Sequence, residues 1–331
     1  MAVLVTGGAG YIGSHMVWTL LDHGEEVVVL DDLSTGFRWA VPDGVEFVEG
    51  SVGDKSLVSN LIAEHDVDAV IHFAGSVVVP ESVENPLKYY QNNTCNTRTL
   101  LETVVQSGID KFIFSSTAAV YGEPMTSGPI REDAVLSPMS PYGSSKLMSE
   151  IMVRDAALSS DLRYVMLRYF NVAGADALGR AGCSAADATH LIKVACEAAL
   201  GKRPSMTIYG DDYDTPDGTC VRDFIHVSDL VNAHYVALEF LRQGGLKFTA
   251  NCGYSRGYSV KQVIDAVKKV SGRNFPVVSG PRRPGDIPSV IANAHRLMSR
   301  LSWQPRHDRL EEIVRDALAW EEKLSAQKQS A

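Results

Sequence analysis

Short apolar runs alternate with longer amphipathic stretches through the first half of the chain. The apolar runs predict buried strands, and the stretches between them predict helices. Strands and helices that alternate in this way are typical of an α/β protein with a doubly wound parallel sheet. The expected strands are Ala2 to Thr6, Glu26 to Leu30, Val45 to Glu49, Ala69 to Phe73, Lys111 to Ser115 and Tyr164 to Arg168.

After Asn171 this alternation gives way to loops containing Gly and Pro around one strong helical stretch, Thr189 to Leu200. Further on, Phe224 to Leu241 predicts a helix and Phe248 to Cys252 a strand. We therefore expect a Rossmann-type domain and a smaller, partly interleaved second domain. The first should span residues 1–171, rejoined by about 224–250, and the second 172–223 and 251–331. The polar tail after Trp320 is expected to fray.

A Gly-rich turn follows the first expected strand and opens an amphipathic stretch, Ser14 to His23. Gly7 suits the tight turn, Gly10 the approach of the backbone to phosphates, and Gly13 the close packing of helix on strand. The second strand ends at Asp31, whose carboxylate can accept hydrogen bonds from ribose hydroxyls and repel a 2′-phosphate. The pattern predicts a dinucleotide site that prefers NAD to NADP.

Tyr142 and Lys146 lie four positions apart and would share one face of a helix. An ammonium group near the phenol lowers the pKa of that phenol, which then acts as a base near neutral pH. The chain therefore combines a cofactor site with a group for proton transfer.

The composition narrows the possible partners. The chain has 331 residues, 45% of them hydrophobic, and a formal net charge of −9. No apolar run approaches the length of a membrane span, and no signal peptide is evident. The acidic balance argues against nucleic acid as a partner. Five cysteines without metal-type spacing predict neither a disulfide framework nor a metal site, and they favour the cytoplasm.

A series of motifs runs along almost the whole chain. They are Thr6 to His15, His72 to Gly75, Tyr89 to Asn93, Ser115 to Thr117, Tyr142 to Lys146, Leu167 to Asn171, Asp217 to Val227 and Arg282 to Asp286. In their order and spacing the chain resembles the UDP-glucose 4-epimerase (UDP-galactose 4-epimerase) family of the extended short-chain dehydrogenase/reductases. The resemblance implies a homodimeric, NAD-dependent isomerase of galactose metabolism that inverts C4 of a UDP-sugar through a 4-keto intermediate.

The resemblance also implies roles for individual residues. Tyr142 is the expected base for the 4-hydroxyl, Thr117 supplies a hydroxyl near the same oxygen, and Lys146 binds the nicotinamide ribose and stabilises the phenolate. The implied cofactor-binding residues are Gly7, Gly10, Tyr11, Ile12, Gly13, Asp31, Thr35, Phe73, Ala74, Gly75, Asn92, Tyr142, Lys146 and Tyr169.

For the UDP-sugar, the resemblance implies a second set of residues, drawn mostly from the second half of the chain. Arginine suits a diphosphate because its guanidinium fork makes charge-assisted hydrogen bonds. Arg222 and Arg283 could instead form surface ion pairs with Asp223 and Asp286. The implied residues are Thr117, Asn171, His190, Leu191, Tyr209, Arg222, Arg283, Asp286 and Val290.

Some of these positions have two interpretations. Val290 aligns with a position whose bulk governs entry of a 2-N-acetyl group, where valine leaves room and tyrosine crowds the pocket; the alternative is simple core packing. His190 stands where the family often has an asparagine at the substrate site. His72 and His226 are interpreted as structural polar residues.

Two positions depart from the family pattern. Ser51 replaces an aspartate that contacts the adenine amino group, and Val77 replaces a lysine that some members place near the NAD phosphate or ribose. Both changes remove polar contacts, so tight retention of NAD is less secure than the resemblance suggests.

Other functions remain open. A 4,6-dehydratase typically needs an acid directly after the active-site threonine, whereas Ala118 and Ala119 follow Thr117. A net dehydrogenase would need exchangeable cofactor, and a non-catalytic NAD-binding regulator would not need the Tyr-Lys pair. The sequence also leaves open which sugars are used: glucose/galactose, N-acetylglucosamine/N-acetylgalactosamine or xylose/arabinose.

Overall fold

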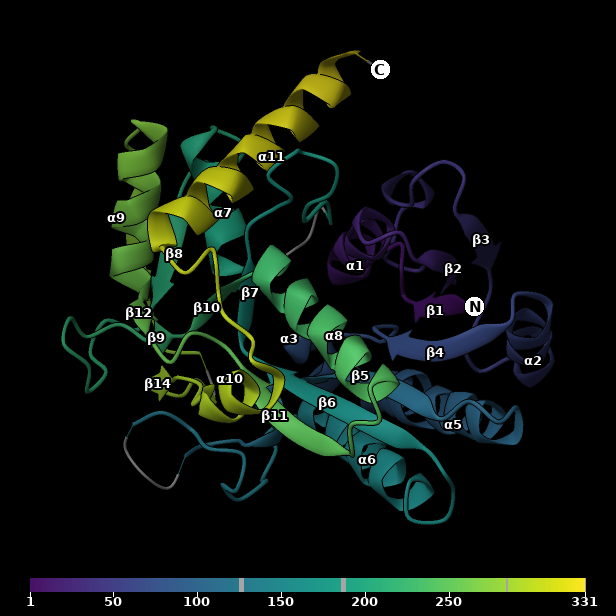
Figure 1. Cartoon of the computed structure of the whole chain (residues 1–331). Helices are drawn as coiled ribbons and strands as arrows, with labels where there is room; N and C mark the ends of the chain where they lie inside the picture. Colours follow the sequence, from purple (N-terminus) through teal and green to yellow (C-terminus); the bar gives the residue numbers. More distant parts are fainter. Residues whose placement is uncertain (125–127, 186–188, 284, 331) are drawn as a thin grey trace.

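The computed structural model describes residues 1–124, 128–185, 189–283 and 285–330, with the backbone alone for 327–330. Within these residues seven parallel strands form the central sheet (Figure 1). In spatial order they are β11 (Phe248–Cys252), β6 (Arg163–Tyr169), β5 (Lys111–Thr117), β4 (Val67–His72), β1 (Ala2–Thr6), β2 (Glu26–Asp31) and β3 (Glu46–Glu49). The predicted doubly wound sheet is confirmed.

Both faces of the sheet are buried, because successive residues of a strand point to opposite sides. Val3 and Val5 of β1 join one core, and Ala2 and Leu4 join another. The first core is covered by α1 (Tyr11–Asp22) and α8 (Val227–Arg242), the second by α2 (Lys55–Glu64), α5 (Asn96–Gln106) and α6 (Pro141–Ala156) (Figure 1). Burial on both sides explains why these strands are apolar almost throughout.

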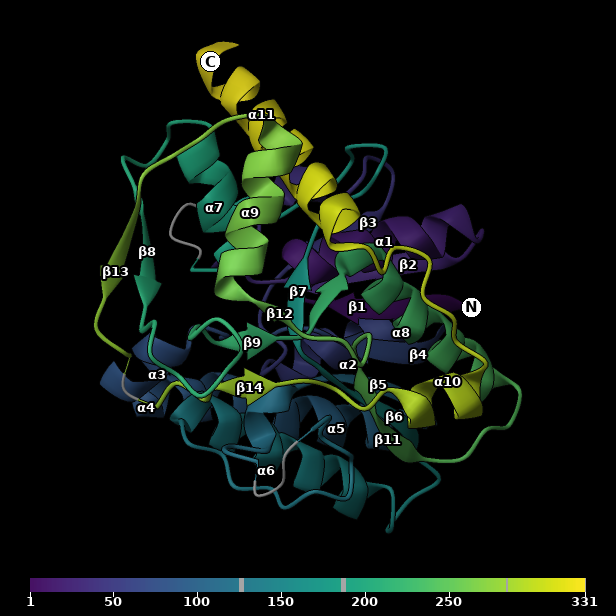
Figure 2. The same ribbon diagram turned by 90° about the vertical axis from the view of Figure 1, so that its left-hand side faces the viewer.

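Smaller sheets lie in the second half of the described chain. They pair β7 (Asn171–Ala173) with β10 (Phe224–His226), β9 (Val221–Arg222) with β12 (Tyr258–Ser259) and β14 (Ser289–Val290), and β8 (Met206–Tyr209) with β13 (Val277–Gly280). Helices α7 (Leu191–Ala199), α9 (Val260–Ser271) and α11 (Leu310–Ser330) pack together around a third core (Figure 2). A further helix, α10 (His295–Leu301), contacts β11.

Short helical segments fill the connections near the sheet. Between β4 and α5 the chain forms α3 (Val79–Glu84), α4 (Pro86–Tyr89) and the π-helix η2 (Tyr90–Cys95), which runs directly into α5. The short helices η1 (Arg38–Ala40) and η3 (Ala118–Val120) follow β2 and β5. A π-helical turn is rare and is often found near a functional site.

Several predicted boundaries were wrong. Phe224–His226 pairs with β7 as a strand, so the helix predicted from Phe224 begins at Val227. The helix predicted from Thr189 begins at Leu191, because His190 is extended at its N-cap. The tail after Trp320 continues as helix to Ser330 instead of fraying. The carboxylate of Glu321 is buried there, where it pairs with two lysines of the α7 region, Lys193 and Lys202.

Candidate active site

The predicted cofactor and catalytic residues gather at the carboxyl edge of the central sheet. Gly7 follows β1, Asp31 ends β2, Phe73 follows β4, Thr117 ends β5 and Tyr169 ends β6. The chain leaves β1 toward β2 on one side and returns later to β4 on the other. Such a switch point leaves a crevice at the carboxyl ends of the strands, where α/β proteins bind ligands.

The glycine turn is shaped as a dinucleotide site requires. Gly7 has φ +72°, and a Cβ there would lie 2.6 Å from the amide nitrogen of Ala74. A Cβ on Gly13 would lie 2.0 Å from the carbonyl oxygen of Gly7, so only glycine lets α1 approach the turn. In the described chain no side chain caps the first turn of α1, which starts after Gly10. Its amide groups can therefore bind phosphate.

Asp31 supports this turn and is buried beside it. Its two carboxylate oxygens accept hydrogen bonds from the backbone amides of Ala9 and Leu33, both at 2.9 Å. Burial raises the pKa of Asp31, and these two hydrogen bonds oppose that shift. The remaining lone pairs of a carboxylate held in this way suit ribose hydroxyls.

The loop after β4 is fixed by Asn93, a residue that the sequence did not single out. Its side-chain oxygen accepts from the amide of Ser76 at 2.8 Å, and its nitrogen donates to Ser145, which precedes Lys146, at 3.0 Å. Asn92 donates to the Ser76 hydroxyl at 2.9 Å. The only signal for Asn93 was its place in the motif Tyr89 to Asn93. The loop residues Phe73, Ala74 and Gly75 are thereby tied to the helix that carries Tyr142.

Other predicted cofactor residues have different surroundings. The Tyr11 hydroxyl donates to the carbonyl of Gly174 at 2.7 Å, so its side chain joins the two halves of the molecule. Ile12 packs against the core below α1, and Thr35 is exposed in the loop after β2. Ser51 accepts from the amide of Gly53 at 3.1 Å, and Val77 is 54% exposed.

Tyr142 lies buried near the start of α6, whose N-cap Ser140 accepts from the amide of Gly143. Burial raises the pKa of Tyr142, while a hydrogen bond with Thr117 lowers it. The Tyr89 ring packs edge-on against the Tyr142 ring, with the two ring centroids 6.4 Å apart. The expectation that Lys146 lowers the phenol pKa is not met in this structure, because desolvation dominates.

Lys146 is 5% exposed, and its ammonium lies 4.3 Å from the centroid of the Phe114 ring. Burial lowers the pKa of Lys146 to about 7, against the opposing charge of Glu150. Burial, and secondly the charge of the same ammonium, lower the pKa of His72 to about 3. The His72 ring nitrogens contact the hydroxyls of Thr6 at 2.7 Å and Thr97 at 2.9 Å, which confirms a structural role.

One turn beyond Lys146, Glu150 forms a buried ion pair that the sequence did not indicate. Both of its oxygens accept from the Arg168 guanidinium, at 2.8 and 2.6 Å, and Ser116 donates to it at 2.6 Å. Arg168 also contacts the hydroxyl of Tyr121 at 2.9 Å. This network joins α6 to the ends of β5 and β6, and so holds the Tyr-Lys helix in place.

Two predicted arginines lie near one another in the second half of the chain. The Arg283 guanidinium lies 3.9 Å from the centroid of the Tyr209 ring. Arg222 donates to the carbonyl of Ile287 at 2.7 Å and pairs with Asp286 at 3.7 Å. The sequence left open surface ion pairs of Arg222 and Arg283 with Asp223 and Asp286, whereas the pair in the structure joins Arg222 to Asp286.

Asp223 is not paired with Arg222. It is buried, and its carboxylate accepts from the backbone amides of Tyr254, Ser255 and Ala292 at 2.9 to 3.2 Å. Asp223 therefore joins its own segment, which follows β9, to the segments that contain Tyr254 and Ala292.

Val290 pairs with Arg222 across β14 and β9, and its partly buried side chain packs against a small core that includes Phe170. Asn171 is exposed at the start of β7, and its amide donates to the Asp223 carbonyl. Exposed His190 precedes Leu191, the first residue of α7. His226 is buried and 3.3 Å from Asp316, in keeping with a structural role.

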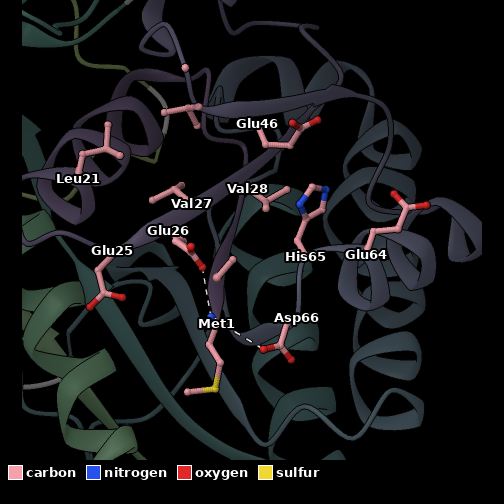
Figure 3. Close-up of a pocket in the computed structure, with 13 residues that line it drawn as sticks. Met1, Leu21, Glu25, Glu26, Val27, Val28, Glu46, Glu64, His65 and Asp66 are labelled. Carbon is pink, nitrogen blue, oxygen red and sulfur yellow. Dashed lines mark hydrogen bonds and ion pairs between the residues drawn. The ribbon is translucent and has the colours of Figure 1, made fainter.

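A depression of about 590 Å³ lies at the opposite, amino edge of the sheet, and Figure 3 shows the residues that line it. The amino group of Met1 lies there, paired with Glu26 at 3.2 Å. The other charged residues of its wall are mostly acidic: Glu25, Glu46, Glu64 and Asp66. This surface would repel a dinucleotide, so it does not compete with the carboxyl edge as a nucleotide site.

Among the residues that the structure describes, no group of three His, Cys, Asp or Glu side chains could hold a metal ion. None of their helices is both long and apolar enough to cross a membrane.

Known proteins resemble this chain over almost its whole length. Residues 3–253 match the NAD dependent epimerase/dehydratase family. The UDP-glucose 4-epimerase of Azospirillum brasilense is 58% identical over 322 residues, 97% of this chain and 92% of that one. The structure of UDP-glucose 4-epimerase from Brucella ovis in complex with NAD has 42% identity and a TM-score of 0.93, covering 96% and 97% of the two chains. The UDP-Glc/GlcNAc 4-epimerase of Campylobacter jejuni has 48% identity and a TM-score of 0.85, covering 97% and 99%.

Proposed function

The chain belongs to the NAD dependent epimerase/dehydratase family, and we propose that it inverts C4 of a UDP-sugar by transient oxidation to the 4-keto sugar. The observation that carries this proposal is the meeting of Tyr142, Thr117 and Lys146 at the end of β5, next to the glycine turn. Relatives that match over almost the full length are UDP-glucose 4-epimerases.

Bound NAD would accept the C4 hydride and return it to the other face of the keto sugar. The glycine turn, the amides at the start of α1 and Asp31 would hold its phosphates and adenine ribose. Tyr142 would remove the 4-hydroxyl proton and later give it back, with Thr117 hydrogen-bonded to the same phenol. Lys146 would bind the nicotinamide ribose, and its ammonium would favour the phenolate by charge, against the desolvation that raises the pKa of Tyr142 in this structure.

For the substrate, we propose that Arg222 and Arg283 bind the diphosphate and that Tyr209, with its exposed ring, contacts the nucleotide. Asn171, His190, Leu191 and Asp286 would complete this wall. Two observations support this proposal. Arg222 belongs to the short strand β9, and the guanidinium of Arg283, a loop residue, packs against the Tyr209 ring.

The direct test is conversion of UDP-sugars by purified protein without added NAD, followed by chromatography. We expect UDP-glucose and UDP-galactose to reach equilibrium from either side, with no net reduced cofactor. Loss of water from the sugar would identify a dehydratase, and a requirement for stoichiometric NAD would identify a dehydrogenase. Ala118 and Ala119, directly after Thr117, provide no acid for elimination. Conversion of UDP-xylose and UDP-arabinose alone would show that the substrates are UDP-pentoses and not UDP-hexoses.

We further infer that the pocket admits a 2-N-acetyl group, because Val290 is small and lies in register with Arg222. The UDP-Glc/GlcNAc 4-epimerase of Campylobacter jejuni supports this reading, with 48% identity. Packing of Val290 against the core near Phe170 is the competing interpretation.

We propose a homodimer formed through α5 and α6, which Figures 1 and 2 place side by side. Met148 and Ile151 of α6 are 45% and 40% exposed. They lie beside a groove lined in part by Leu101, Val105, Met152 and Ala156. Light scattering should give the mass of a dimer, and Ile151→Glu should shift it toward the monomer without loss of folding.

The domain division is also a proposal: residues 1–171 with about 224–250 bind NAD, and 172–223 with 251–331 bind the UDP-sugar. Pairing of β11 with β6 and packing of α8 on α1 support this interleaving. We place the protein in the cytoplasm, in galactose metabolism, on the support of five free cysteines among the described residues and of the UDP-glucose relatives.

A further inference from the structure

Two tryptophans from opposite ends of the chain stack on one another. The Trp39 and Trp320 rings have centroids 6.3 Å apart and planes inclined by 25°. Trp39 lies on η1, in the connection between β2 and β3, and is 53% exposed. Trp320 belongs to α11 and is 4% exposed. The stack therefore links the C-terminal helix to the loop that follows Asp31.

The Trp39 loop lies directly against the proposed cofactor site. The amide of Phe37 donates to the carbonyl of Ala9, inside the glycine turn, at 3.0 Å. Gly36 approaches so closely that a Cβ there would lie 2.9 Å from the carbonyl carbon of Ala9. At the start of the loop, the Leu33 amide donates to Asp31. Residues 32–41, the adenosine loop, thus touch both the glycine turn and the carboxylate expected to bind the ribose.

By contrast, Trp320 is held firmly on its own side. Its indole nitrogen donates to the Ser184 hydroxyl at 3.2 Å, and a Cβ on Gly182 would lie 2.3 Å from the indole ring. The next residue, Glu321, is buried and pairs with Lys193 and Lys202. A fixed tryptophan can restrain the more exposed one that packs on it, because the contact resists outward movement of the loop.

We propose that the Trp39–Trp320 stack holds the adenosine loop against the glycine turn and slows the release of NAD. This inference rests on the proposed placement of the NAD adenosine at Asp31. By restraining the loop, the stack would offset part of the retention lost with the polar contacts at Ser51 and Val77. Trp39 and Trp320 act as positioning residues for the cofactor.

The test measures how fast labelled NAD leaves the holoenzyme when unlabelled NAD is added in excess. Trp39→Ala should release NAD about two to ten times faster than wild type, as expected for the loss of one aromatic pair. Trp39→Phe keeps a ring for stacking and should restore most of the slow release. Both variants should still unfold cooperatively on heating without nucleotide, and Trp39→Ala should lower the midpoint only by the few degrees that the loss of one aromatic pair costs.

Asp31→Ala separates this inference from the function on which it rests. If Asp31→Ala leaves NAD release unchanged, the placement of the adenosine is wrong. If Asp31→Ala speeds release while Trp39→Ala does not, the stack has no part in retention. Equal acceleration by Trp39→Ala and Trp39→Phe would also overturn the proposal, because stacking would then not be the cause. Since Trp320 is packed inside the fold, Trp320→Phe is the variant to use at that position.

Discussion

The ammonium of Lys146 lies over the face of the Phe114 ring, 4.3 Å from its centroid. Phe114 belongs to β5, and the same strand ends at Thr117, which is hydrogen-bonded to Tyr142. One strand therefore contacts both members of the Tyr-Lys pair. The aromatic face offsets part of the cost of removing the ammonium from water, although burial still lowers the pKa of Lys146 to about 7.

Tyr142→Phe should lower kcat by at least the roughly 100-fold typical of losing a general base, because phenylalanine fills the same space without the hydroxyl. Interconversion of UDP-glucose and UDP-galactose measures the effect. Tyr235→Phe is a matched control: that tyrosine lies on α8 with its ring stacked on His23, and its loss should leave kcat unchanged. Near-normal activity of Tyr142→Phe would show that Tyr142 is not the catalytic base.

Asp31→Ala should weaken binding of NAD and narrow the preference for NAD over NADP, because the variant loses both an acceptor for the ribose and the charge that repels a 2′-phosphate. Reconstitution of nucleotide-free protein with each cofactor, followed by the activity assay, measures the preference. Asp32→Ala removes a neighbouring exposed acid and serves as the control. Equal use of NAD and NADP by the wild type would show that Asp31 does not select the cofactor.

Val290→Tyr should suppress conversion of the N-acetylated sugar pair while leaving the plain hexoses active, because a steric clash acts on the larger substrate alone. The ratio of kcat/KM for UDP-N-acetylglucosamine to that for UDP-glucose is the measurement. Wild-type protein active on UDP-galactose but inert on both acetylated sugars would show that other walls close the pocket. A parallel loss on all sugars would point instead to the core packing near Phe170.

The stability of nucleotide-free protein should rise with pH above neutrality because of Lys146. Its folded-state pKa is about 7, whereas that of lysine in an unfolded chain is about 10.4. Between these values the unfolded chain binds a proton that the folded chain does not, so the free energy of unfolding increases with pH. Below pH 7 the penalty for burying the ammonium is fully present.

Urea unfolding of wild type and Lys146→Met from pH 6 to 9 isolates this effect, since other groups cancel in the difference. Above pH 7 the free energy of unfolding of the wild type should rise relative to that of Lys146→Met, by at most about 1.4 kcal/mol per pH unit. A difference that is independent of pH would mean that Lys146 keeps its proton in the folded protein.

Some of the site could be predicted from sequence because its signals are local. The positive φ of Gly7, the close packing of Gly13 and the four-residue spacing of Tyr142 and Lys146 each depend on residues near one another in the chain. Asn93 and the pair of Glu150 with Arg168 were missed. Their polar side chains are buried only when separate elements pack together, and no local pattern marks which polar residues meet.

The sequence by itself determined the parallel sheet, the glycine turn at its carboxyl edge and the identity of the Tyr-Lys helix, because strand and helix patterns reflect the burial of neighbouring residues. Only the tertiary structure decided the ionisation of that pair. The pKa of Tyr142 is raised and that of Lys146 lowered by burial under elements that come from elsewhere in the chain. The stack of Trp39 on Trp320 is likewise a product of packing alone, since it joins residues near the two ends of the sequence.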